Sequence, residues 1–288
     1  MEIVYTRNSK ELARSLAKDL ALSAFPANTR RFANGEISVS LPKSFCDAAV
    51  VSSTVANDDW IELLLLLDAL RDAKNIILCM PYMGYSRQDT QSQNESLGAR
   101  LFARLLEATN VARCIVLDNH CEPMMRIPYA HLSANEIFET DVVRKYALEQ
   151  IVVVSPDIGG AYRASALSRS LKCGFAVCNK ARDVFGELKK TEAVGEVSNK
   201  ICILVDDIVD SGATLCHAAE ALLSAGAKGI AAYAVHGVLS DGSRERLEKS
   251  RIEEIVLTDS ISGPDISSPK FRKLSVASLL AEAIRCTI

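Results

Sequence analysis

The chain has 288 residues, of which 49% are hydrophobic and 24% are charged. This composition is typical of a globular protein and excludes a wholly disordered chain. The 33 basic and 36 acidic residues give a net charge of −3, so the chain offers no strongly basic surface. We therefore expect no nucleic-acid partner.

The sequence also lacks the signals of export and of membrane insertion. No stretch approaches the roughly 18 consecutive apolar residues that a membrane span requires, and polar residues interrupt the N-terminal segment where a signal peptide would be apolar. The nine cysteines form no Cys-x-x-Cys pair, and several lie in apolar runs. They are expected to be reduced and buried, as is usual in the cytoplasm.

Short apolar strands alternate with amphipathic helices along the chain. The apolar runs predict strands at residues 2–5, 49–53, 75–80, 114–118, 150–155, 175–178, 201–206, 230–236 and 255–258. Helical spacing of apolar residues predicts helices at residues 9–20, 60–72, 98–108, 161–171, 215–225, 243–250 and 276–285. Strands that are apolar on both faces and alternate with helices indicate an α/β fold with largely parallel sheets flanked by helices. We expect two such domains, at residues 1–142 and 143–288.

Ligands bind beyond the carboxyl ends of parallel strands, and the richest segment of this kind follows the strand at 201–206. Asp206 stands at the strand end, and the run Asp210-Ser211-Gly212-Ala213-Thr214 leads into a helix. Small residues admit a ligand, and amides at a helix N-terminus bind anions. Carboxylates beside such a site indicate sugar hydroxyls or a bound cation. The alternative is an acidic strand end followed by a capping loop.

Other strand ends carry further candidate residues. Arg87 and Gln88, after the strand at 75–80, have donors for phosphate oxygens or a base. His120 is a candidate metal ligand or a structural histidine. Asp157 suits Mg²⁺ as a hard oxygen ligand, or forms a turn that caps the next helix.

Two further segments join this set. Lys180 and Arg182 stand two residues apart in a segment expected to be an extended loop, so their side chains are expected to point the same way. They would clamp a polyphosphate or lie in solvent. Residues 30–39 contain Asn34-Gly35, which predicts a hairpin turn.

Seven segments together resemble the ribose-phosphate diphosphokinase (phosphoribosyl pyrophosphate synthetase) family over nearly the whole chain. They are RFANGEISV, ELLLLLDAL, PYMGYSRQD, DNHC, SPDIGGAYR, NKAR and LVDDIVDSGATLCHAAEALLSAGA. The resemblance implies two phosphoribosyltransferase-like domains and transfer of the diphosphoryl group of ATP to O1 of ribose 5-phosphate, which yields 5-phosphoribosyl 1-pyrophosphate and AMP. It also implies Mg²⁺ as the cofactor and a homo-oligomer, with dimers assembling to a hexamer in the family.

The resemblance also implies a role for each candidate residue. The catalytic residues would be Lys180 and Arg182, which stabilise the charge developing on the transferred group. The ATP-binding residues would be Phe32, Asn34, Gly35, Glu36, Arg87 and Gln88, with the hairpin residues reaching the adenine pocket of a neighbouring subunit. The ribose 5-phosphate-binding residues would be Arg182, Asp206, Asp210, Ser211, Gly212, Ala213 and Thr214. The metal ligands would be His120 and Asp157.

One departure from the family leaves a second function open. Members usually carry several basic residues in a mobile loop, but the corresponding segment here, residues 90–96, has no cation. A non-catalytic regulatory member of the same family is therefore an alternative. A phosphoribosyltransferase is a third, which would explain residues 206–214 but not the first 150 residues.

Overall fold

The structure is a computed structural model that describes residues 1–182, 188–263 and 268–287, with residues 180–182 and 188–190 described by their backbone. The contacts divide the chain into two compact units. Unit 1 contains Met1–Ser133, Asp259–Ser262 and Ser275–Ile288, and unit 2 contains Ala134–Thr258 and Gly263–Leu274.

Unit 1 is built on a six-stranded sheet in the order β2-β1-β5-β6-β7-β8, in which every neighbouring pair is parallel. The strands are β1 (Glu2–Tyr5), β2 (Ala24–Pro26), β5 (Asp47–Val51), β6 (Asn75–Met80), β7 (Arg113–Leu117) and β8 (Tyr129–Leu132). A separate antiparallel hairpin consists of β3 (Asn28–Arg31) and β4 (Ile37–Ser40).

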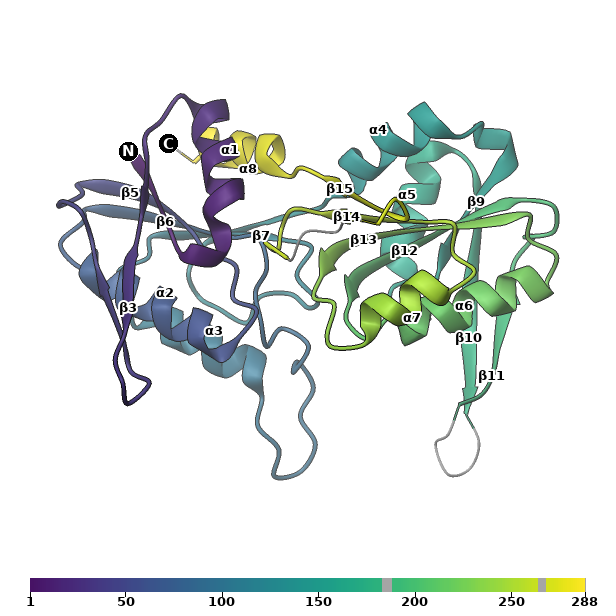
Figure 1. The fold of residues 1–288 in the computed structure, drawn as a ribbon, viewed down its shortest axis with the longest axis horizontal. Coiled ribbons are helices and arrows are strands. Elements are labelled where there is room, and N and C mark those ends of the chain that lie inside the picture. Colours follow the sequence, from purple (N-terminus) through teal and green to yellow (C-terminus); the bar gives the residue numbers. More distant parts are fainter. Residues whose placement is uncertain (183–187, 264–267, 288) are drawn as a thin grey trace. The chain divides into compact units, whose positions relative to one another are not determined.

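Helices cover both faces of this sheet (Figure 1). They are α1 (Lys10–Leu20), α2 (Asn57–Ala69), α3 (Gly98–Glu107) and α8 (Ala277–Arg285), and a short 3₁₀ helix, η1 (Arg7–Ser9), precedes α1. Helix α2 buries Trp60, Leu63 and Leu67, which recur at helical spacing on one face. This stripe packs against Ile76 and Leu78 of β6, so a single hydrophobic core joins the helix to the sheet.

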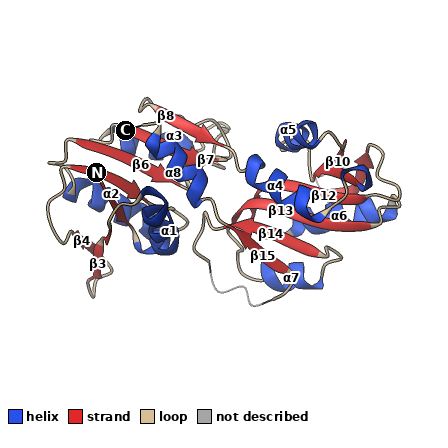
Figure 2. Ribbon diagram, turned by 90° about the horizontal axis from the view of Figure 1, so that it is seen from above, coloured by secondary structure: helices blue, strands red, loops and turns tan. Residues whose placement is uncertain are grey.

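Unit 2 contains a seven-stranded sheet in the order β11-β10-β9-β12-β13-β14-β15, parallel except for the pair β10–β11. The strands are β9 (Ile151–Ser155), β10 (Gly174–Arg182), β11 (Leu188–Val194), β12 (Ile201–Val209), β13 (Gly229–Gly237), β14 (Glu254–Thr258) and β15 (Phe271–Leu274). The helices are α4 (Asn135–Lys145), α5 (Ala161–Leu171), α6 (Ala213–Ser224) and α7 (Ser243–Lys249), and the 3₁₀ helix η2 (Leu148–Gln150) precedes β9. Figure 2 shows β12 to β15 side by side in this sheet.

The predicted fold class is confirmed, and the observed division differs from residues 1–142 and 143–288 in three places, one of which is the short segment Asp259–Ser262 in unit 1. A break after residue 142 would fall inside α4, which belongs wholly to unit 2. The C-terminal helix α8 belongs to unit 1, where it packs on α1 and buries Leu280 and Ile284. Arg285 also donates a hydrogen bond to the carbonyl oxygen of Asp19, at the other end of the chain.

The cysteines are buried less often than expected: four lie in the core, three are partly exposed, and Cys46 and Cys286 are exposed. None of the nine cysteines, all of which lie in the described ranges, forms a disulfide bond. Burial raises the pKa of the Cys79 and Cys114 thiols to about 12, so both are protonated, inert core residues. Among the described residues, no helix combines the length and the apolarity needed to cross a membrane.

A half-buried charge network holds α4 on the sheet of unit 2. Arg272 of β15 donates to Asp141 of α4 over 2.8 Å and to Glu254 of β14 over 3.1 Å, and the Tyr233 hydroxyl donates to Asp141 over 2.8 Å. Burial alone would raise the pKa of Asp141 and Glu254. The hydrogen bonds and positive charges of Arg272 and Lys145 outweigh it and hold both pKa values below the ordinary 3.8 and 4.5.

Because both carboxyl pKa values are lowered by folding, the network stabilises the protein above pH 4.5 and loses its effect as the pH falls through the folded values. Arg272→Met should lower the free energy of unfolding at pH 7 by about 2–4 kcal/mol, since it removes the guanidinium that Asp141 and Glu254 share. Denaturant titrations should show the deficit shrinking toward pH 3. Arg71→Met, which breaks an exposed pair with Asp68, is the control and should change stability little at either pH. A deficit that is independent of pH would contradict this assignment.

Candidate active site

In unit 2, the loop after β9 turns sharply and presents Asp157. The Ser155 hydroxyl donates to the carbonyl oxygen of Asp157 over 2.6 Å, and the Gly160 amide donates to Asp157 Oδ1 over 3.2 Å. The second bond is the capping turn expected as the alternative role for Asp157. It holds the half-buried carboxylate beside the start of α5, so the same turn also orients Asp157 at the edge of the sheet.

The neighbouring strand β12 carries the next carboxylates. It continues to Val209 instead of ending at Asp206 as predicted, because its pairing with β13 runs as far as Gly237. The Asp207 amide donates to Asp206 Oδ1 over 3.0 Å. Asp207 itself lies 3.7 Å from the guanidinium of Arg163, a pair in which both side chains are buried. The two adjacent aspartates therefore differ, since Asp207 has a cationic partner within the fold.

Asp157 and Asp206 follow the paired ends of β9 and β12, and both lie beside Gly160. A β-carbon on Gly160 would lie 3.2 Å from Ser155 Oγ and 3.9 Å from an oxygen of each carboxylate, so a larger residue would crowd this position. Burial and the charges of Asp207 and Asp157 raise the pKa of Asp206 well above its ordinary value of 3.8. A cation or hydroxyl donors at this place would relieve the electrostatic repulsion that acts on Asp206.

The segment from Asp210 to Thr214 forms the turn into α6. Gly212 has a φ of +74°, and a β-carbon there would lie 2.8 Å from Leu247 Cγ, so only glycine fits. Arg246 of α7 donates to the Ser211 carbonyl oxygen over 2.6 Å, and the Ala213 amide donates to Ser211 Oγ over 3.4 Å. Helix α7 thus holds the turn that leads into α6, and a helix N-terminus favours an anion.

The two candidate catalytic cations lie on a strand and not in the extended loop that the sequence predicted. The backbone of β10 continues through Lys180 and Arg182 and pairs antiparallel with β11, forming a two-stranded arm (Figure 1). A bulge falls between Ala181 and Arg182. Residue 183, the end of the predicted loop, lies outside the described residues.

In unit 1, residues 30–39 form the predicted hairpin. The Phe32 amide donates to the Glu36 carbonyl oxygen over 2.8 Å, and Glu36 N–H donates to Asn34 Oδ1 over 3.2 Å. Gly35 supplies the positive φ of +92° that the turn needs. Phe32 is 43% exposed, so the turn presents an aromatic ring and a carboxylate at its surface.

The loop after β6 is fixed at its beginning and presents Arg87 and Gln88 at its end. A β-carbon on Gly84 would lie 2.1 Å from the Thr54 carbonyl oxygen, and the Gly84 amide donates to Thr54 Oγ1 over 3.0 Å. The Tyr85 ring stacks on that of Phe102 in α3 at 4.0 Å between centroids. Arg87 and Gln88 are exposed beyond this anchor, as a binding role requires.

His120 is exposed on the loop that follows β7, and a second histidine orients that loop. The buried Asn119 donates its amide proton to His131 Nε2 over 3.0 Å, and its side chain donates to the Cys121 carbonyl oxygen over 2.8 Å. His131 Nδ1 lies 3.4 Å from Glu122 Oε1. His120 belongs to unit 1 and Asp157 to unit 2, so their joint metal binding stays a prediction.

Sequence reasoning missed three residues that position the candidate groups. Arg163 compensates Asp207, Arg246 holds the Ser211 carbonyl, and His131 accepts from the Asn119 amide. Arg163 is the last residue of the segment SPDIGGAYR, so its place in this family-like segment could have indicated a role at the site. His131 and Arg246 stand alone in the sequence, and only the folded chain brings them to these loops.

Comparison with known proteins accounts for the whole chain. Residues 1–109 match the N-terminal domain of ribose phosphate pyrophosphokinase, and residues 186–288 match the phosphoribosyl synthetase-associated domain. A ribose-phosphate pyrophosphokinase of Agrobacterium fabrum is 40% identical over 299 residues, which cover 100% of this chain and 96% of that relative. One of Burkholderia pseudomallei is 38% identical over 97% of this chain and 92% of its own length.

A solved structure extends this similarity to the fold. The crystal structure of phosphoribosylpyrophosphate synthetase from Mycobacterium smegmatis superposes with a TM-score of 0.91 at 34% identity. The superposition covers 100% of this chain and 99% of that one. This chain therefore belongs to the ribose-phosphate pyrophosphokinase family.

Proposed function

We propose that this chain transfers the diphosphoryl group of ATP to O1 of ribose 5-phosphate, forming 5-phosphoribosyl 1-pyrophosphate and AMP. The observation that carries this proposal is the position of Asp157 and Asp206 beside Gly160, with Asp206 on the strand that leads into a small-residue turn at the N-terminus of α6. Such a site suits a sugar phosphate and a cation together. Full-length relatives named for this activity support it and do not favour the phosphoribosyltransferase or the non-catalytic alternative.

The donor set fits Mg²⁺ as the cofactor. Among the described residues, no three or more His, Cys, Asp or Glu side chains gather into a complete metal cage. Mg²⁺ does not require one, because it commonly binds one or two carboxylates and takes its other ligands from substrate phosphates and water. Asp157 and His120 would hold the ion, with Asp206 close to Asp157. When bound, the ion neutralises charge on the transferred group.

The remaining candidate residues would bind the two substrates, ribose 5-phosphate and ATP. The turn from Asp210 to Thr214, with Asp206, would bind ribose 5-phosphate. The carboxylates would accept hydrogen bonds from the sugar hydroxyls, and the amides at the start of α6 would donate to the phosphate. The hairpin turn with Phe32, Asn34, Gly35 and Glu36 would bind ATP together with Arg87 and Gln88. Lys180 and Arg182 would stabilise the charge on the migrating diphosphoryl group, and Arg182 would also contact ribose 5-phosphate.

The assembly and the cellular site belong to the same proposal. We expect a homo-oligomer in which the hairpin turn reaches the nucleotide site of a neighbouring subunit, with dimers assembling to a hexamer. The buried, unpaired thiol groups of Cys79 and Cys114 support a reducing compartment, the cytoplasm.

One assay tests the activity. Purified protein with ribose 5-phosphate, ATP and Mg²⁺ should form AMP and 5-phosphoribosyl 1-pyrophosphate, and omission of ribose 5-phosphate or Mg²⁺ should abolish both. Formation of ADP would indicate transfer of one phosphoryl group instead. Failure to form either nucleotide product would favour the non-catalytic alternative.

Asp210→Ala should raise the KM for ribose 5-phosphate while changing the KM for ATP little. A sugar hydroxyl left without its partner in a closed site costs about 1–3 kcal/mol, or roughly 5- to 150-fold in KM. Asp241→Ala removes an exposed carboxylate from another loop of unit 2 and serves as the control. An unchanged KM for ribose 5-phosphate in Asp210→Ala would show that this loop does not bind the sugar.

A further inference from the structure

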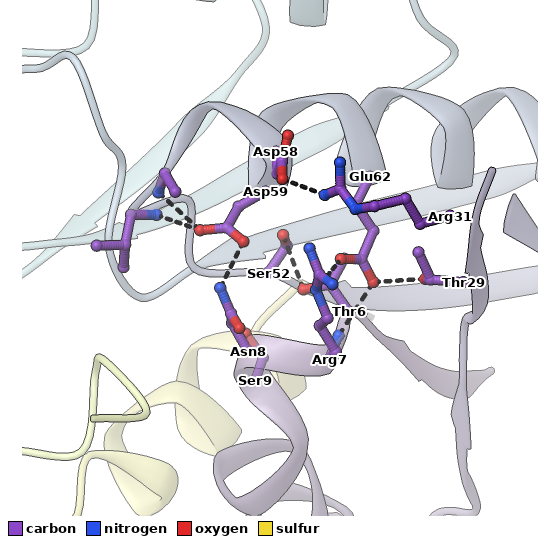
Figure 3. A network of polar contacts seen from close by, with 12 residues as sticks. Thr6, Arg7, Asn8, Ser9, Thr29, Arg31, Ser52, Asp58, Asp59 and Glu62 are labelled. Atoms are coloured by element: carbon purple, nitrogen blue, oxygen red, sulfur yellow. Dashed lines mark hydrogen bonds and ion pairs between the residues drawn. The ribbon is translucent and has the colours of Figure 1, made fainter. Parts of the chain in front are cut away.

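The first turns of α2 carry three carboxylates that face different neighbours (Figure 3). Asp59 caps its own helix, accepting from the amides of Val55 and Ala56 over 3.0 and 2.7 Å. Asp58 and Glu62 instead reach the hairpin strand β3. Since they stand one helical turn apart, they lie on the same face of α2.

Strand β3 offers a matching pair. Thr29 and Arg31 are two residues apart and therefore share a face of the strand. The Thr29 hydroxyl donates to Glu62 Oε1 over 2.7 Å, and Arg31 pairs with Asp58. Glu62 is fully buried and also binds Arg7, whose Nε lies 3.0 Å from Glu62 Oε2. The strand is thus attached to α2 at two points, one buried and one at the surface.

Arg31 extends this attachment to the turn. While Nη2 of its guanidinium pairs with Asp58, Nη1 donates to the Gly35 carbonyl oxygen over 2.9 Å. The planar guanidinium therefore bridges α2 and the backbone between Asn34 and Glu36. Both partners of the ion pair are about half exposed, at 46% and 50%, so the pair contributes little to overall stability.

We propose that Arg31, held by Asp58, is a positioning residue that sets the backbone of the turn at residues 32–36 for the nucleotide. This inference rests on the proposed function, in which that turn binds ATP. On this proposal the Asp58–Arg31 pair increases the affinity for ATP and contributes little to the stability of the fold. Its loss should weaken ATP binding while leaving the ribose 5-phosphate turn of unit 2 unaffected.

The test compares Asp58→Asn with Asp68→Asn. Both change one aspartate of α2 that pairs with an arginine, but Asp68 pairs with Arg71 at the other end of the helix, away from the hairpin. In Asp58→Asn the KM for ATP should rise about 3- to 10-fold, with the KM for ribose 5-phosphate and kcat within about twofold of the parent. Asp68→Asn should match the parent in all three constants. Fluorescence of Trp60, the single tryptophan, reports whether unit 1 keeps its fold.

A reversed pair separates positioning from simple attachment. Asp58→Arg with Arg31→Asp restores attraction between α2 and β3, but residue 31 then has no proton to donate to the Gly35 carbonyl. The thermal midpoint should match the parent, while the KM for ATP stays raised. Recovery of that KM in the reversed pair, an unchanged KM in Asp58→Asn, or dissociation of the assembly in Asp58→Asn would overturn the inference. A parent enzyme that forms no AMP would instead refute the proposed function.

Discussion

Lys180→Ala should lower kcat by about 10²–10⁴ and change the KM for ribose 5-phosphate little. The diphosphoryl group gains charge at its transferred and leaving atoms as it migrates, so a cation that meets it acts mainly in the transition state. Steady-state kinetics with AMP as the measured product provide the check. The placement of Lys180 on the paired backbone of β10 and β11 is compatible with this role, because a strand holds a cation more rigidly than a loop.

Lys228→Ala is the matched control, since it removes an exposed lysine from the same unit. It should leave both constants within about twofold of the parent. A Lys180→Ala enzyme whose change is confined to the KM for ribose 5-phosphate would place Lys180 in ground-state binding. An equal decrease of kcat in Lys180→Ala and Lys228→Ala would indicate a general effect of lost positive charge. It would contradict a catalytic role for Lys180.

Asp206→Asn should reduce kcat/KM by about 10² and at the same time stabilise the fold. The carboxylate is largely buried, and the charges of Asp207 and Asp157 oppose its ionisation. Since its pKa is raised by folding, ionised Asp206 costs stability at pH 7. Removing the charge should raise the free energy of unfolding by about 1 kcal/mol, or about 2–4 °C in Tm.

Asp207→Asn should behave in the opposite way. Asp207 neutralises the buried Arg163, and its Oδ1 accepts from the Ile208 amide over 2.9 Å. Loss of its charge removes the carboxylate partner of a buried guanidinium, which should lower the free energy of unfolding by about 3 kcal/mol. Thermal unfolding of the two variants in parallel measures both signs. Destabilisation by Asp206→Asn would mean that its charge is already balanced in the fold.

The elements that sequence patterns predicted well have a long apolar run or a clear amphipathic pattern. Strand β6 and helix α5 match their predicted bounds, because long apolar or amphipathic runs leave little choice of structure. The elements that were missed, β2, β8, β11, β15 and α4, are short or polar. Four of them, β2, β8, β11 and β15, are the outermost strands of their sheets. An outermost strand pairs with only one neighbouring strand, and it tolerates polar residues.

The candidate ligand-binding residues could be identified from short stretches of the sequence. Strand-end aspartates, a small-residue turn and a helix start are contiguous, so the sequence of residues 201–224 alone predicts a phosphate and sugar site. Other features depend on partners distant in the chain. Helix α8 packs on α1 in unit 1, the charge of Asp157 acts on Asp206, and Arg31 pairs with Asp58. These pairings arise from the burial of helix faces and from the order of strands in each sheet, which no local pattern encodes.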